Sequence, residues 1–190
     1  MRRPPATSTF AYSFGPGPLT PAVKLLIISN VVVFIASRFI DVLRLRLGFM
    51  PQDVLTHGYI WQPFTYMFVH DGIFHILFNM LALWMFGVEL ERMWGSRYFT
   101  KFYLVSGVGA AVVQTLLSFV PLAALQQVYY IQTVGASGAV FGVLLAYAMY
   151  FPHRPIYMYF VFPIPAKYFV MIIGAISLLS SIHGPRPGSG

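Results

Sequence analysis

The chain has 190 residues, of which 58% are hydrophobic and only 9% are charged, and its mean hydropathy is +0.72. A typical soluble domain carries roughly 25% charged residues, so this composition speaks against a water-soluble globule and against a disordered protein. The absence of cysteine excludes a disulfide scaffold, a thiol nucleophile and a zinc–thiolate site. The composition therefore favours an integral membrane protein of about one domain.

Residues 1–22 are predicted to be a tail, because they contain five prolines and two glycines. Prolines at this density prevent a continuous helix. A secretory signal peptide would place its apolar core closer to the first residue. The apolar run that follows the tail is therefore predicted to be a retained helix of the mature protein.

Five apolar runs follow the tail. They are Val23–Ile40, Gly72–Leu90, Tyr98–Val120, Thr133–Phe151 and Tyr157–Ile182. A membrane-spanning helix needs roughly 17–25 residues, and each run comes close to that range. Two prolines break the fifth run, so its helix is predicted to begin near Ala166. The expected fold is an all-α, polytopic helical bundle over residues 23–182, followed by an outer loop over 183–190.

The basic residues indicate how this bundle is oriented. The net charge is +7, from 12 Lys and Arg against 5 Asp and Glu. Eight basic residues precede the first predicted helix or lie between helices two and three and between helices four and five, and four lie on the opposite side. This asymmetry predicts a cytoplasmic N-terminus. Because no basic stripe with interleaved aromatic residues stands out, nucleic acid is not an expected partner.

The connection Asp41–Val69 is long for a helical bundle and rich in aromatic residues. Two interpretations are open. It can lie in the membrane interface with its aromatic rings at headgroup level, or it can pack as an ordinary loop against the bundle.

Three polar residues near the start of the second run form a first candidate cluster. His75 and Asn79 are four residues apart and share one helix face, and His70 lies five residues before His75. Their N–H groups are the kind of donors that a developing oxyanion needs. The alternative is that they only form hydrogen bonds between helices.

The segment Gly135-Ala136-Ser137-Gly138 at the start of the fourth run is the second candidate. A lone serine in a membrane helix usually bonds to a carbonyl of the preceding turn, so this motif alone is a weak signal. Gly138, Gly142 and Ala146 continue as a small-residue face that allows another helix to approach closely. With the predicted topology, both clusters lie in the outer half of the membrane, which suits a serine nucleophile beside an oxyanion hole.

Three motifs together resemble those of the rhomboid intramembrane serine proteases. They are His70-x4-His75-x3-Asn79, Gly87-x3-Glu91-x3-Gly95 and Gly135-Ala136-Ser137-Gly138. Their order and topology also match, and the resemblance covers nearly the whole chain from the first helix onward. It implies a helical bundle of the rhomboid type, with five transmembrane helices present of an expected six. The Trp-Arg pair of the family's first loop reads Trp61-Gln62 here.

The resemblance also implies roles for individual residues. Ser137 would be the nucleophile, His75 and Asn79 would line the oxyanion hole, and His70 and Gly135 would shape the site. The sequence shows no site for a metal or an organic cofactor, so neither is expected. The expected substrates are single-pass transmembrane proteins, cleaved near the outer face of the membrane. A compact core with a short tail favours a prokaryotic plasma membrane.

Two further expectations concern the parts around this site. Glu91 would tie down the cytoplasmic loop through Arg92 or Arg97. The family's general base is a histidine on a sixth helix, and the chain reaches Gly190 before any sixth apolar run. His183 is the substitute base within the chain, although it precedes a loop rich in glycine and proline. If the missing helix normally covers the Gly138–Gly142 face, that face would form an open groove.

Three functions therefore stay open at this point. The first is an intramembrane serine endopeptidase whose present chain is truncated and inactive. The second is a catalytically inactive rhomboid-like protein that binds transmembrane helices. A small transporter or channel is disfavoured, because neither an inverted repeat nor a chain of charged residues appears.

Overall fold

The computed structural model describes residues 15–158 and 162–183. The elements are α1 (Pro21–Phe39), α2 (Asp41–Leu47), α3 (Pro51–His57), α4 (Gln62–Thr65), η1 (Tyr66–Phe68), α5 (Ile73–Ala82), η2 (Leu83–Gly87), α6 (Val88–Trp94), α7 (Ser96–Ser118), α8 (Ala123–Gln126), η3 (Gln127–Tyr130), α9 (Ser137–Tyr150), β1 (Pro155–Met158), β2 (Phe162–Pro165) and α10 (Ala166–His183). Most of the predicted tail (residues 1–14 of 1–22) and most of the predicted outer loop (residues 184–190 of 183–190) lie outside this description.

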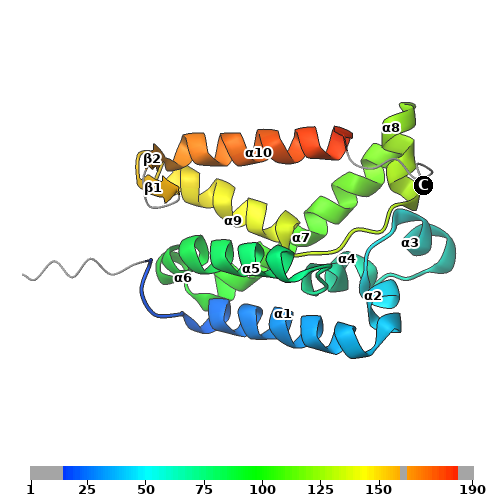
Figure 1. Cartoon of the computed structure of the whole chain (residues 1–190), viewed down its shortest axis with the longest axis horizontal. Coiled ribbons are helices and arrows are strands. Elements are labelled where there is room, and N and C mark those ends of the chain that lie inside the picture. Colours follow the sequence, from blue (N-terminus) through cyan, green and yellow to red (C-terminus); the bar gives the residue numbers. More distant parts are fainter. Residues whose placement is uncertain (1–14, 159–161, 184–190) are drawn as a thin grey trace, which may run out of the picture.

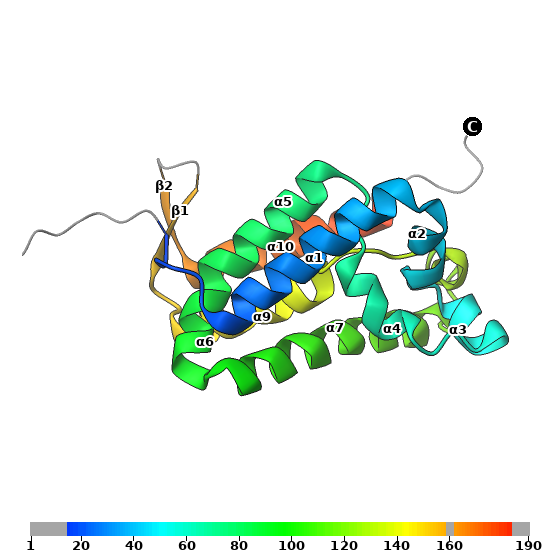
Figure 2. The ribbon, with the colours of Figure 1, turned by 90° about the horizontal axis from the view of Figure 1, so that it is seen from below.

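Helix α9 lies in the middle of the bundle. It packs against α7, α10, α5 and η2, while α1 packs on the other side of α5, η2 and α7. Figure 1 shows α10, α9, α5 and α1 one above another, with the β1–β2 hairpin at one end and α2, α3 and α8 at the other. Figure 2 shows α7 running along the side of this stack. Helices α5 and α9 both begin toward the end that carries α2 and α4.

Within the described residues, three helices are long and apolar enough to cross a membrane. They are Pro21–Phe39, the continuous helix Ile73–Trp94 and Ser96–Ser118. Ser137–Tyr150 and the described part of α10 are shorter apolar helices. The all-α membrane fold is thereby confirmed. The fifth helix begins at Ala166, as the two prolines before it predict, whereas the fourth begins at Ser137, later than Thr133.

A two-stranded antiparallel hairpin separates α9 from α10 and was not expected from the sequence. Strand β1 pairs with β2 so that Ile156 lies opposite Ile164, and Pro155 lies opposite Pro165. The sequence predicted only that no helix would begin before Ala166, and no strand was expected in this part of the apolar run. Proline lacks the N–H that a helix interior needs but is tolerated at the edge of a short ladder, which explains the difference.

The connection after α1 folds into short helices that pack on the bundle. Gln62, at the position of the family's arginine, is fully buried. Its Oε1 accepts from the Met50 N–H at 3.1 Å, and its Nε2 donates to Asp53 at 3.2 Å. Trp61 remains partly exposed and donates to the carbonyl of Arg46 at 2.9 Å. A neutral amide therefore joins the two halves of this loop.

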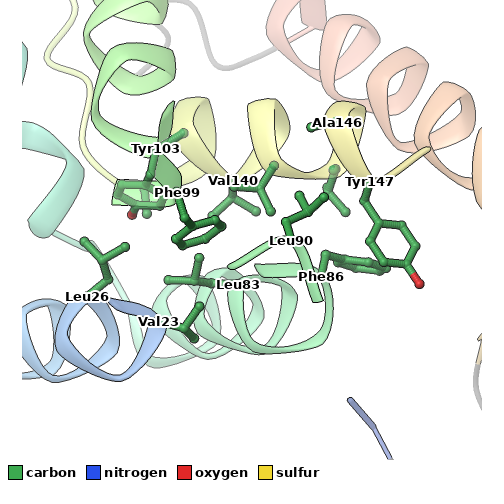
Figure 3. Close-up of a cluster of buried hydrophobic side chains, with 14 of the residues drawn as sticks. Val23, Leu26, Leu83, Phe86, Leu90, Phe99, Tyr103, Val140, Ala146 and Tyr147 are labelled. Carbon is green, nitrogen blue, oxygen red and sulfur yellow. The ribbon is translucent and has the colours of Figure 1, made fainter. Parts of the chain in front are cut away.

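The apolar core joins α1, the α5–α6 helix, α7 and α9. Figure 3 shows Val23, Leu83, Phe99 and Val140 from these four elements converging on one cluster. Each of the four side chains is no more than 5% exposed. Helix α9 is buried around most of its circumference, as its lack of any polar face predicts.

The small-residue face of α9 does not form the expected groove. A Cβ on Gly138 would lie 2.7 Å from Cβ of Ala110, and one on Gly142 would lie 2.5 Å from Oγ of Ser106. Both neighbours belong to α7. The groove prediction is therefore wrong, because α7 uses this face for its own close approach.

Candidate active site

Gly135 ends the segment that leads into α9. Its φ angle of +114° is one that residues with a side chain rarely adopt. Its N–H donates to the carbonyl of Tyr66 at 3.0 Å, which fixes the segment against η1. A Cβ at this position would lie 2.6 Å from Cε1 and Nε2 of His75. The glycine is thus required by the backbone angle and by the imidazole ring beside it.

His70 contacts the same segment from the other motif. It is 2% exposed, and its Nε2 accepts a hydrogen bond from the Ala136 N–H at 3.4 Å. His70 precedes the span that starts at Ile73. Burial lowers the pKa of His70 to about 4, with a further contribution from His75 and partial opposition from the backbone of Phe68. A neutral imidazole can accept at Nε2, as the geometry requires.

His75 and Asn79 lie on one face of α5, as their spacing predicts. The rings of His70 and His75 meet edge to face, with centroids 5.0 Å apart. The Asn79 Nδ2 donates to the carbonyl of His75 at 2.8 Å. An amide nitrogen carries two hydrogens, so one N–H of Asn79 remains after this bond.

Ser137 is the first residue of α9 and is partly buried. Among the described residues, its hydroxyl has no hydrogen-bond partner. The first N–H groups of a helix have no partner within that helix, and the N-terminus carries a partial positive charge. The backbone at Ser137 therefore offers donors next to the hydroxyl, in the arrangement that stabilises an oxyanion. His183 ends α10, and its side chain lies outside the described residues.

Tyr66 contributes to the site, although the sequence analysis did not identify it. Besides accepting from Gly135, it donates its hydroxyl to the carbonyl of Gly107 at 2.7 Å. A Cβ on Gly138 would lie 3.0 Å from this hydroxyl oxygen. Tyr66 thus fastens the start of α9 to α7. One aromatic residue in an aromatic loop carries no sequence pattern that would single it out.

Glu91 of the second motif has different partners from those expected. It is 3% exposed and accepts from the N–H groups of Ala22 and Val23, each at 2.9 Å. The hydroxyl of Ser96 donates to it at 2.6 Å, and the hydroxyl of Thr20 donates as well. Glu91 therefore caps the N-terminus of α1, where a negative charge is favourable. The expected arginine partners were wrong.

The two glycines around Glu91 have distinct structural roles. A Cβ on Gly87 would lie 3.0 Å from the ring of Phe99 and 3.1 Å from Val23, so this position lets α1 and α7 approach closely. Gly95 has a φ of +79° and ends α6 at the turn into α7. Arg92, which the sequence offered as a partner of Glu91, donates instead to the carbonyls of Pro16 and Pro18.

An apolar cavity of about 340 Å³ lies between α5–η2, α9 and α10. Its lining includes Phe78, Met85, Leu144, Ile156 and Phe169. Such a cavity suits apolar side chains rather than a polar ligand. Among the side chains that the structure describes, no group of three His, Asp or Glu residues could bind a metal ion.

Comparison with known proteins gives a consistent result. The chain is 37% identical over 110 residues to Rhomboid protein 1, mitochondrial, of Saccharomyces cerevisiae, covering 58% of the chain and 30% of that protein. It is 36% identical over 97 residues to Rhomboid protease GluP of Bacillus subtilis, covering 51% and 17%. It is 30% identical over 151 residues to RHOMBOID-like protein 12, mitochondrial, of Arabidopsis thaliana, covering 74% and 45%. The chain thus spans less than half the length of these relatives. The Rhomboid domain family model matches residues 57–185, and the chain belongs to the rhomboid family.

Proposed function

We propose that this chain carries the catalytic core of an intramembrane serine endopeptidase, with Ser137 as the nucleophile. The observation that carries the proposal is the contact between two motifs that are far apart in the sequence. His70 accepts from the Ala136 N–H, and the His75 ring lies against Gly135, so both histidines meet the residues just before Ser137. The name of the GluP relative, a rhomboid protease, supports the same reaction.

The proposed reaction begins with attack of the Ser137 hydroxyl on a peptide carbonyl. The carbonyl oxygen becomes an oxyanion, which the Ser137 N–H, the His75 ring and the remaining Asn79 N–H would stabilise. Collapse of this intermediate releases the amine product and leaves an acyl-enzyme on Ser137. Water entering from the outer side would then hydrolyse the ester.

The proton of the Ser137 hydroxyl needs a base within hydrogen-bond reach. By resemblance to the family, we propose that this base is a histidine on a sixth helix. His183 is the alternative within the chain. The expected substrates are single-pass transmembrane proteins, and the apolar cavity between α5, α9 and α10 supports the binding of an apolar segment.

We further propose an N-terminus on the cytoplasmic side, because eight of the twelve basic residues would then lie there. The relatives include a bacterial protein and two proteins named as mitochondrial. We propose the prokaryotic plasma membrane as the location of this chain.

A second candidate is a rhomboid-like protein that binds transmembrane helices without cleaving them. It is favoured by the Ser137 hydroxyl, which has no partner among the described residues. Both candidates predict binding of an apolar helix, so only chemistry at Ser137 separates them.

The test is labelling with a serine-reactive fluorophosphonate in mild detergent, with Ser137→Ala as the control. Labelling that depends on Ser137 would place a base within the 190 residues, and His183→Ala would be the next variant. The absence of labelling from a folded chain would place the base elsewhere. A longer form that contains a sixth helix should then cleave a transmembrane substrate, and cleavage that survives Ser137→Ala would overturn the protease proposal.

A further inference from the structure

The two halves of the candidate site are both attached to α2, the short helix that follows α1. The first attachment is an ion pair, in which Nη2 of Arg44 lies 2.6 Å from Oδ1 of Asp71. Asp71 directly follows His70. Arg38 at the end of α1 donates to the carbonyl of Asp71 at 3.2 Å, so two arginines hold this residue.

These residues surround a polar pocket of about 140 Å³. Its lining consists of Ser37, Arg38, Asp41, Arg44, His70 and Asp71. The side chains of Arg44 and Asp71 are about half exposed, at 53% and 50%. An exposed ion pair adds little to the stability of a fold. Because the Arg44–Asp71 pair lies next to the buried His70, we expect it to position the site rather than to stabilise the fold.

The second attachment uses backbone carbonyls in the middle of α2. Nε2 of Gln132 donates to the backbone carbonyls of Arg44 and Leu45, at 3.2 and 3.1 Å. A Cβ on Gly48 would lie 2.7 Å from this nitrogen, so the glycine leaves room for the amide. Gln132 precedes Ser137 by five residues on the segment that enters α9.

A short backbone ladder strengthens this second attachment. The Phe49 N–H donates to the carbonyl of Thr133 at 2.9 Å, and the Thr133 N–H donates to the carbonyl of Phe49 at 2.7 Å. The side chains of Thr133 and Gln114 also form hydrogen bonds with each other. The segment before Ser137 is therefore held to the end of α2 by backbone and by side chain.

We infer that Arg44 is a positioning residue of the site. Its guanidinium holds Asp71 and thereby His70, while its carbonyl holds Gln132 and thereby the segment that carries Ser137. Arg44 therefore connects both motifs to the same helix, α2. Loss of the ion pair would let the His70 segment move relative to Ala136 and change how the donors around Ser137 are aligned. This inference rests on the proposed function of Ser137.

The test uses the absence of native cysteine, because Ser137→Cys then introduces a single thiol at the site. The alkylation rate of this thiol is measured against pH in mild detergent, which gives its pKa without any need for turnover. The thiol stands at a helix N-terminus, and its pKa depends on the donors around it. We expect Arg44→Gln and Asp71→Asn each to move the thiol pKa toward its ordinary value of about 8.5. We also expect each variant to slow alkylation at neutral pH by about tenfold, as a small misplacement of reacting groups does.

The matched control is Arg46→Gln, on the same helix. Arg46 bonds to the hydroxyl of Tyr59 rather than to Asp71, and its substitution should leave the alkylation rate within about twofold. The double variant should be no slower than either single variant, and the exchange Arg44→Asp with Asp71→Arg should recover part of the rate. Circular dichroism before each measurement establishes that the variant is folded.

Two results would overturn the inference. One is that, in the Arg44→Gln variant, the pKa and the alkylation rate of the introduced thiol equal those of the Ser137→Cys parent or of Arg46→Gln. The other is additive effects of the two single variants with no recovery on charge exchange. Failure of the protease proposal is a separate result, since it would appear as cleavage that survives Ser137→Ala and would leave the thiol measurements unchanged.

Discussion

The imidazole of His75 lies against the α-carbon of Gly135, so closely that any Cβ there would sit 2.6 Å from Cε1 and Nε2. These residues belong to motifs separated by sixty positions in the chain. Their contact places the His75 ring, a candidate oxyanion donor, beside the residues that precede Ser137.

Gly135→Ala should therefore damage both the site and the fold. The alanine would have to adopt a φ of +114° or displace the His75 ring. We expect a loss of about 1–3 kcal/mol in the free energy of unfolding from the strained backbone. We also expect a drop of about a hundredfold in the cleavage rate of a form that contains the base.

The control is Gly109→Ala in α7, where no atom in the described part of the chain lies within 4 Å of an added Cβ. This variant should cleave and unfold like the parent. Equal behaviour of the two alanine variants would contradict the assigned contact.

Glu91 should be far more important for stability than its neighbour Glu89. Glu91→Gln replaces one acceptor oxygen by an N–H that faces donors, so we expect the free energy of unfolding to fall by about 2 kcal/mol. Glu89 pairs with Arg154 on a partly exposed surface, and Glu89→Gln should cost at most about 1 kcal/mol. Unfolding in a series of denaturing detergent mixtures measures both. A larger effect at Glu89 would argue against Glu91 as the cap of α1.

The contact between α7 and α9 predicts the effect of filling the small-residue face. Gly142→Val would press a side chain into Ser106 and should lower the free energy of unfolding by about 1–3 kcal/mol. Gly174→Val in α10 is the control, because no atom of the described residues lies within 4 Å of an added Cβ there. If Gly142→Val unfolds no more easily than Gly174→Val, α7 does not cover this face.

His70 predicts a dependence of stability on pH. Burial lowers its pKa from 6.5 to about 4, so between these values the unfolded chain binds a proton that the folded chain does not. Stability should fall as the pH is lowered from about 6.5 to about 4 and should not change through His70 above that window.

The variant His70→Gln should lose this part of the pH dependence. The charged groups around the pocket of His70 are Arg38, Asp41, Arg44 and Asp71, and they stay in place in both proteins. Thermal unfolding midpoints in detergent at several pH values give the comparison. An unchanged slope in His70→Gln would show that other groups cause the dependence.

The positions of most long helices could be predicted from local patterns of apolar residues and prolines. Apolar runs long enough to span a membrane predicted α1, α5–α6 and α7, and Pro165 predicted that the last helix begins at Ala166. Spacing alone placed His75 and Asn79 on one face of α5. The hairpin β1–β2 was missed because an apolar run has no period that separates a short strand from a helix.

Hydropathy, proline positions and motif spacing are local properties of the chain, so they were enough to predict a helical membrane protein of the rhomboid family. Which side chains and backbone groups meet depends on the folded structure. In the folded structure, Glu91 caps the N-terminus of α1, and α7 packs against the small-residue face of α9. Arg44 contacts both Asp71 and Gln132. These partners are tens of residues apart, and hydrogen bonds and close packing act over a few ångströms, so folding alone brings them within reach.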